Sequence, residues 1–295
     1  MNRSDRGASD GSVGIDSSWK RRLTKALAET PLAPTLLDAA RPLVGLLNGT
    51  DLEDLEAVIE DKREEWAEFI YSEASGFNLP RTYPLDYAVG IHLYTHYDPA
   101  VFSVVNEAMF NPARRKPGAA AAAETVISAE LQTCLPYIKF LDAALEALPP
   151  AYVFVGQVRR GVQWVYPSPE EHDPEGYFAA GAMLMWYEFK STSRQQKVMT
   201  RPHFCGVGAG PRTIFTVAAC RGYNIEKFSY FQGVDSEYEV LFRPLSKFRV
   251  VHAQKNIIDP RETVSLERSG FPDAILLQQV DDAPAAAAAS APVPS

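Results

Sequence analysis

The chain has 295 residues, of which 46% are hydrophobic and 22% are charged, which is typical of a globular protein with one large domain or two small ones. Its formal net charge of −8, with lysines and arginines scattered along the chain, argues against a nucleic-acid partner held by bulk charge. The three cysteines fit no CxxC pattern, and no Cys–His cluster indicates a metal site.

The sequence carries no membrane signal. The N-terminus has no apolar signal core, and no apolar run reaches the ~18 residues that a spanning helix needs. We therefore expect a soluble, cytoplasmic protein without a membrane partner. Secretion by a route that needs no signal peptide stays open.

The first half of the chain predicts helices. Residues 1–18 are rich in Ser, Gly and Asp and are expected to be disordered, and 19–49 predict a short helical extension. Thr50 is a good N-cap with Glu53 three residues on, so a helix is expected from 51 to about 72. Three more segments have helical spacing: 85–95, 100–110 and 119–148, the last interrupted near Pro136.

After Pro149-Pro150 the pattern changes to short apolar runs between Gly, Pro and Asp, which is typical of strands. Strands are expected near these ranges: 151–158, 182–189, 213–218, 237–242, 247–254 and 274–280. The Ala/Pro-rich tail at 281–295 is expected to be disordered. Helices followed by strands predict an α+β fold. We expect one domain over 50–280, with a helical part (50–150) and a strand-rich part (151–280).

Three short pieces of the strand-rich part carry suitable chemistry. An Arg159-Arg160-Gly161 step ends the first strand, and an arginine fork next to glycine suits a phosphate ligand. Ser191-Thr192-Ser193 presents hydroxyl groups, and Glu237 and Glu239 share one face if they lie in a strand. Taken singly, each piece is better explained by a surface turn, an edge strand or a solvated strand end.

Their order changes this interpretation. Arg-Gly, then aromatic-x-Ser-Thr-Ser, then Glu-x-Glu resembles the arginine–serine–glutamate class of NAD(P)-dependent, arginine-specific mono-ADP-ribosyltransferases. The run 213–250 and the helical stretch 85–106 are also similar to that family, and the resemblance covers roughly residues 50–280. It implies helices packed on a mixed, mostly antiparallel β-sandwich core, with NAD as the substrate and no metal.

The resemblance also implies roles for individual residues. Arg160 would bind an NAD phosphate, Gly161 would offer backbone groups to the nicotinamide carboxamide, and Ser191 would orient the catalytic glutamate, with Thr192 and Ser193 completing the motif. Glu239 would be that catalytic glutamate.

The acceptor side of the family pattern follows in the same run. Glu237 would serve a protein substrate that presents arginine, and residues 228–238 would meet that protein through Tyr230 or Phe231. One departure is visible, because Arg159 stands where many members carry an aromatic residue. Arg159 is therefore an alternative phosphate ligand.

The chemistry needs these residue types. Cleavage of the N-glycosidic bond of NAD develops positive charge on the ribose, which a fixed carboxylate stabilises. A guanidinium is protonated at neutral pH, so a second carboxylate is needed to bind it and take its proton. The leading hypothesis is a protein-arginine ADP-ribosyltransferase. The alternatives are an NAD glycohydrolase and a catalytically weak module that binds NAD or a protein.

Overall fold

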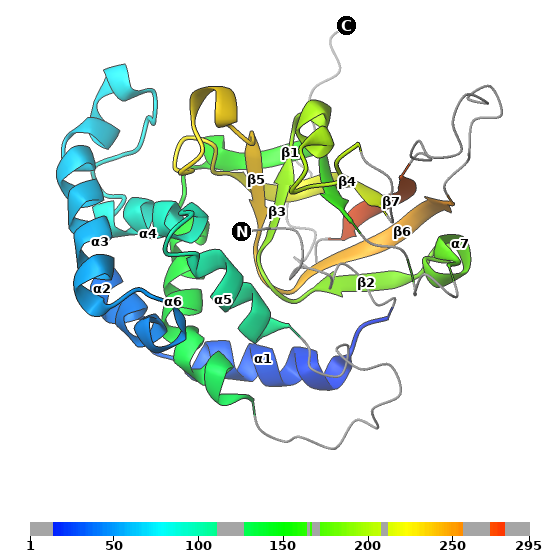
Figure 1. Ribbon diagram of the computed structural model, residues 1–295, viewed down its shortest axis with the longest axis horizontal. Helices are drawn as coiled ribbons and strands as arrows, with labels where there is room; N and C mark the ends of the chain where they lie inside the picture. Colours follow the sequence, from blue (N-terminus) through cyan, green and yellow to red (C-terminus); the bar gives the residue numbers. More distant parts are fainter. Residues whose placement is uncertain are drawn as a thin grey trace, which may run out of the picture.

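The computed structural model describes residues 14–110, 127–163, 166, 172–207, 212–255 and 272–280. Most helices come first and the strands follow, as the sequence predicts, and the helices that precede the first strand lie together on one side of the sheet (Figure 1). Residues 1–13 of the end expected to be disordered at 1–18, the expected disordered tail at 281–295, and the start of the helix expected at 119–148 lie outside the described residues. The expectation for 1–18 was wrong at its end, because Ser17 and Ser18 begin the first helix.

The helices of the first half are close to their predicted positions, and a short helix in the strand-rich part, α7 (Pro174–Tyr177), was not predicted. Their bounds are α1 Ser17–Glu29, α2 Leu36–Ala40, α3 Leu52–Trp66, α4 Leu85–Thr95, α5 Val101–Met109, α6 Ala129–Glu146 and the short α7 Pro174–Tyr177. Helix α4 has the predicted bounds, whereas α3 ends at Trp66, before the expected end near Ser72. The interruption expected near Pro136 was wrong, because this proline lies inside α6.

The start of α3 differs from the prediction by one residue. Asp51, not Thr50, is the N-cap: its carboxylate accepts from the backbone N–H of Asp54 at 2.9 Å, and the carboxylate of Asp54 accepts from the N–H of Asp51 at 3.2 Å. Aspartate caps at least as well as threonine, so a second good cap displaces the first.

Within the described residues, the strands form one seven-stranded sheet in the order β1-β3-β5-β4-β7-β6-β2. Their bounds are β1 Val153–Val162, β2 Met183–Trp186, β3 Lys190–Ser193, β4 Thr213–Asn224, β5 Glu239–Phe242, β6 Ser246–Gln254 and β7 Asp273–Val280. All pairings are antiparallel except that of β4 with β7. Since β1 also pairs with β4, the strands β1, β3, β5 and β4 close on one another like a small barrel. The predicted sandwich is therefore not confirmed.

Strand β5 separates two hydrophobic cores. Its residues alternate between the two faces: Leu241 packs in the core shared with the helices, and Val240 and Phe242 pack in the core among the strands. Glu239 is two residues before Leu241, so its side chain lies on the face of β5 that turns toward the helices. All four residues of β5 are buried.

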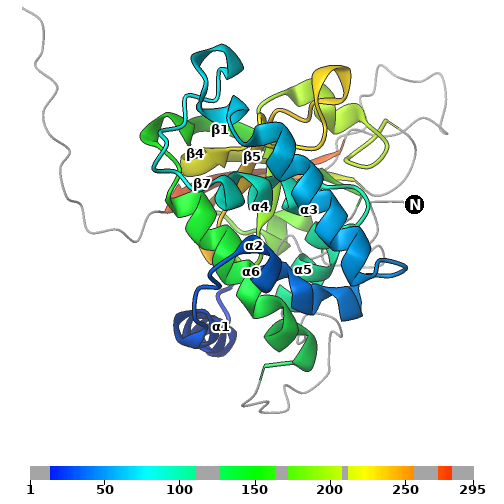
Figure 2. The same ribbon diagram turned by 90° about the vertical axis from the view of Figure 1, so that its left-hand side faces the viewer.

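The helices cover the sheet as one layer. Figure 2 shows α3, α4 and α6 in front of the strands. A bidentate ion pair joins the two layers, in which Arg243 donates to Asp142 of α6 at 2.6 and 2.8 Å. Among the described residues, none of the helices has both the length and the apolar composition to cross a membrane.

Candidate active site

Strands β3 and β5 bring the serine motif beside a glutamate. In their antiparallel register Ser193 lies opposite Glu239, and Ser191 lies opposite Leu241. Directly opposed residues share a face, so both serines lie on the face that carries Glu239. The side chain of Glu239 is buried. The structure thus places Ser191, Ser193 and Glu239 on one face, with Ser193 and not Ser191 directly opposite the glutamate.

The hydroxyl groups of Thr192 and Ser193 bond to the backbone near β5. Thr192 donates to the carbonyl of Val240 at 2.7 Å, and Ser193 donates to the carbonyl of Glu237 at 2.6 Å. These two bonds fix the backbone on both sides of Glu239. The motif therefore holds the glutamate segment through its backbone.

Glu237 lies outside the strand. Strand β5 begins at Glu239, and Tyr238 has a left-handed backbone with φ of 50°. The two-residue repeat of a strand therefore does not relate the two glutamates, and the strand predicted from Glu237 onward is corrected. A non-glycine residue in this conformation costs on the order of 1–3 kcal/mol, which the surrounding packing must offset.

The packing that offsets it comes from the segment 196–206. Tyr238 lies against a small hydrophobic cluster, whose buried members are Val198, Met199, Phe204 and Cys205. The ammonium group of Lys197 lies 5.6 Å from the centre of the Tyr238 ring. With its ring held in this way, Tyr238 turns the chain and leaves Glu237 buried beside the same segment.

Two further side chains of this segment hold the loop before β5. Arg201 donates to the backbone carbonyls of Val234, Asp235 and Ser236 at 3.1, 2.9 and 3.1 Å. The Nε2 atom of His203 lies 3.4 Å from Oε1 of Glu237. Sequence reasoning missed both residues, because no local pattern marks them and their partners lie more than thirty residues away.

Both arginines of the first motif lie where β1 meets β3. Arg159 is opposite Ser193, which is the one register pair that joins the two strands. Its guanidinium donates to Gln157 at 2.7 Å, at an exposed position. Arg160 is half-buried, and its guanidinium donates to the carbonyl of Ser191 at 2.9 Å. Arg160 thus reaches across to the serine motif, and Arg159 shares the face of Ser193.

Gly161 is packed against the segment that carries His203. A Cβ atom added at Gly161 would lie 2.7 Å from Cβ and 2.9 Å from the backbone nitrogen of Cys205. Both distances are shorter than real Cβ contacts, so only glycine permits this approach. The role given to Gly161 by the resemblance is a backbone contact with nicotinamide, and the structure adds a packing reason for the same residue.

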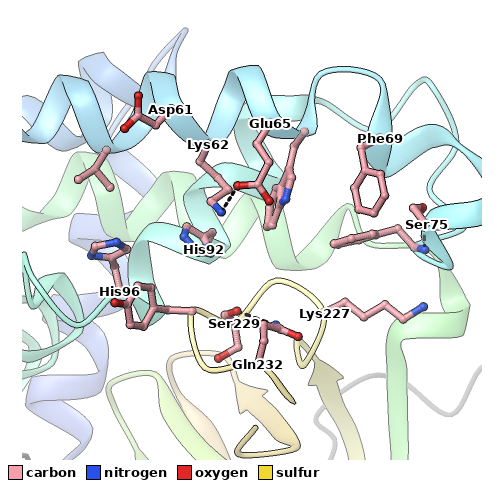
Figure 3. Close-up of a pocket in the computed structure, with 14 residues that line it drawn as sticks. Asp61, Lys62, Glu65, Phe69, Ser75, His92, His96, Lys227, Ser229 and Gln232 are labelled. Carbon is pink, nitrogen blue, oxygen red and sulfur yellow. Dashed lines mark hydrogen bonds and ion pairs between the residues drawn. The ribbon is translucent and has the colours of Figure 1, made fainter. Parts of the chain in front are cut away.

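Tyr230 lies at a separate cavity of about 560 Å³ between α3, α4 and the chain after β4. Figure 3 shows α3 on one side of it, Ser229 and Gln232 on the other, and His92 and His96 between them. The ring of Tyr230 packs on His96 with centroids 4.5 Å apart, and its exposed fraction is 45%. Tyr230 is thus partly open to a partner.

The two histidines of this cavity are part of the packing. His92 is buried, its Nδ1 atom donates to the carbonyl of Phe228 at 2.9 Å, and burial lowers its pKa to about 4. Burial also lowers the pKa of His96. Phe231 is half-buried and packs edge-on against Tyr230, with centroids 5.4 Å apart. Within the described ranges, no group of three or more His, Cys, Asp or Glu residues is arranged to hold a metal ion.

Comparison with solved structures shows the fold. The type III effector XopAI from Xanthomonas axonopodis pv. citri is similar over 92% of this chain and 96% of that one, with 14% identity and a TM-score of 0.56. HopU1 of Pseudomonas syringae pv. Tomato DC3000, an ADP-ribosyltransferase, matches with 18% identity, 91% and 99% coverage and a TM-score of 0.49. The ADP-ribosyltransferase Vis from Vibrio splendidus, solved in complex with agmatine, matches with 19% identity, 77% and 86% coverage and a TM-score of 0.47.

No curated protein sequence matches the chain significantly. The family model described as NAD:arginine ADP-ribosyltransferase, however, matches residues 37–270, which include α3 to α6 and all strands up to β6. NAD is the substrate of this family, and ADP-ribose transfer is its activity. The chain belongs to the NAD:arginine ADP-ribosyltransferase family.

Proposed function

We propose that this protein transfers ADP-ribose from NAD to arginine side chains of a protein substrate. The observation that carries the proposal is the pair of buried glutamates at the start of β5, next to the serine motif of β3, in a chain of this family. Buried carboxylates are costly unless a site uses them. The donors around them, which are hydroxyl groups and guanidinium groups, suit a phosphate-bearing dinucleotide with polar ribose groups.

Glu239 stabilises the charge that develops when the glycosidic bond breaks. The bond between C1′ of the ribose and the nicotinamide nitrogen breaks, and its electron pair leaves with nicotinamide as a neutral group. Positive charge then develops on the ribose, where a fixed and buried carboxylate acts more strongly than it does in water. The backbone bonds from Thr192 and Ser193 hold Glu239 in place for this task.

Glu237 serves the acceptor. A guanidinium nitrogen forms the new bond to C1′, and the guanidinium must lose a proton as it does so. A carboxylate binds the guanidinium in a bidentate fork and takes that proton. The left-handed turn at Tyr238 places Glu237 outside the strand, on the loop that precedes it, so the two carboxylates have separate positions for separate tasks.

The remaining motif residues bind NAD. Arg160 takes a phosphate group, Gly161 offers its backbone to the carboxamide of nicotinamide, and Ser191 orients Glu239. The hydrogen bond from Arg160 to the carbonyl of Ser191 links the phosphate ligand to the serine motif. Tyr230, partly exposed on the loop before Glu237, contacts the protein substrate.

The release of nicotinamide from NAD, measured with and without agmatine as the acceptor, tests this function. Formation of an ADP-ribosyl agmatine adduct supports the transferase. Release without an adduct favours the glycohydrolase, and no release favours a module that binds NAD without turnover.

A further inference from the structure

We propose that His203 is a positioning residue for Glu237 and thereby sets how much ADP-ribose goes to arginine instead of water. The proposal rests on the function proposed above and deepens it. The Nε2 atom of His203 lies 3.4 Å from Oε1 of Glu237, and the side chain of His203 is 34% exposed while that of Glu237 is 2% exposed. A buried carboxylate therefore has an imidazole partner that reaches it from the more solvent-exposed side.

The segment that carries His203 is rigidly built. The N–H groups of Cys205 and Gly206 both donate to the carbonyl of Met199, at 3.1 and 3.0 Å, and the N–H of Phe204 donates to that of Arg201 at 3.0 Å. The ring of Phe204 packs against the imidazole of His203, with centroids 4.7 Å apart. The imidazole is thus held on a folded turn.

The same segment also fixes the backbone that leads to Glu237. Arg201, two residues before His203, donates to three successive carbonyls from Val234 to Ser236. One short piece of chain therefore holds the glutamate loop by its backbone, through Arg201, and the carboxylate by its side chain, through His203. Neither contact is made to Glu239.

This division predicts a selective effect. A base works only when it is held within reach of the proton that it takes, so loss of the imidazole frees the carboxylate of Glu237 to adopt other rotamers. Attack by arginine then slows, whereas cleavage of NAD, which depends on Glu239, is affected less. Each ADP-ribosyl group that arginine fails to capture is released to water.

The test compares His203→Ala, His203→Gln and the matched control His252→Ala, since His252 is an exposed histidine on β6. Agmatine adduct and free ADP-ribose are quantified from the same reaction, with kcat and KM for agmatine. Loss of the polar partner of a buried charged group has an effect of at least about tenfold, so His203→Ala is expected to lower the ratio of adduct to free ADP-ribose by about tenfold or more. His203→Gln keeps an N–H donor and is expected to stay within about threefold of wild type, and His252→Ala is expected to match it.

Several results overturn the inference. One is a His203→Ala variant whose ratio of agmatine adduct to free ADP-ribose equals that of wild type. A second is an equal loss of adduct and free ADP-ribose, which means that the residue supports the whole site and not Glu237. A third is a His203→Gln variant as impaired as His203→Ala, which means that the N–H donor is not the cause. Failure of wild type itself to form an adduct refutes the arginine-transferase function and is distinguishable from all three.

Discussion

Replacement of Gly161 by alanine is expected to disturb both the packing of β1 and the activity of the site. The added Cβ would lie 2.7 Å from Cβ of Cys205, 2.9 Å from the nitrogen of Cys205 and 3.2 Å from Sδ of Met199. Two of these atoms belong to the rigid turn that carries His203, so they cannot yield as the tip of a flexible side chain does. Overpacking of this kind costs about 1–3 kcal/mol.

The cost converts into a measurable change in melting temperature. A protein of this size loses about 2–4 °C per kcal/mol, so Gly161→Ala is expected to melt roughly 2–12 °C below wild type in thermal unfolding followed by circular dichroism. The displaced turn also carries the partner of Glu237. The ratio of agmatine adduct to free ADP-ribose is therefore expected to fall in the same variant.

Two further variants, a control and a double mutant, test the origin of the lost stability. Gly45→Ala is the control, because nothing lies within 4 Å of its added Cβ, and its melting temperature is expected to match that of wild type. Cys205→Gly combined with Gly161→Ala removes the closest contact and is expected to recover part of the lost stability. If Gly161→Ala has the same melting temperature and the same adduct ratio as wild type, the close approach of β1 to this turn is refuted.

Three further outcomes are expected. Arg160→Lys is expected to raise the KM for NAD by about tenfold or more in a nicotinamide-release assay, because lysine cannot form a bidentate phosphate contact. Arg159→Lys is expected to leave this KM near the wild-type value. A raised KM in Arg159→Lys and a wild-type KM in Arg160→Lys would instead make Arg159 the phosphate ligand. Lys190→Met removes the ammonium group that lies 2.6 Å from the buried carboxylate of Glu188. The free energy of unfolding, measured by urea titration, is expected to fall by about 3–5 kcal/mol, and a fall below about 1 kcal/mol would contradict a stabilising ion pair. Burial lowers the pKa of His92 from 6.5 to about 4, so between these pH values the unfolded chain binds a proton that the folded chain does not. The free energy of unfolding is therefore expected to fall by up to about 3 kcal/mol as the pH drops from 6.5 to 4. His92→Gln is expected to show a smaller fall over the same pH range, and an equal fall would refute His92 as its source.

The sequence predicts most of the fold because local signals coincide with packing. Helix α4 has its predicted bounds, since its apolar residues and flanking prolines all favour one helix. Pro136 did not interrupt α6, because tertiary burial of the helix overrides the local cost of a proline. The closure of the sheet was missed, since the pairing of β1 with β4 joins residues about sixty positions apart and leaves no local pattern.

The candidate site divides in the same way. The sequence placed the serine motif beside Glu239 with Ser191 as its partner, whereas the register sets Ser193 opposite Glu239, because the exact strand register is not encoded in the order of the motifs. The position of Glu237 outside the strand was not predicted, because the left-handed turn at Tyr238 depends on packing against the segment 196–206. His203 was missed for the same reason, since its distance to Glu237 exists only in the folded chain.

The central claim is that two glutamates divide the reaction, with Glu239 cleaving NAD and Glu237 serving arginine. The most direct measurement is mass spectrometry of agmatine incubated with NAD and wild type, Glu237→Gln or Glu239→Gln. We expect an ADP-ribosyl adduct only with wild type, free ADP-ribose with Glu237→Gln, and a loss of both products by ~10²–10³-fold with Glu239→Gln. Free ADP-ribose from wild type and Glu237→Gln alike, with no adduct from either, would contradict arginine transfer, and loss of hydrolysis in Glu237→Gln as complete as in Glu239→Gln would contradict the division of roles.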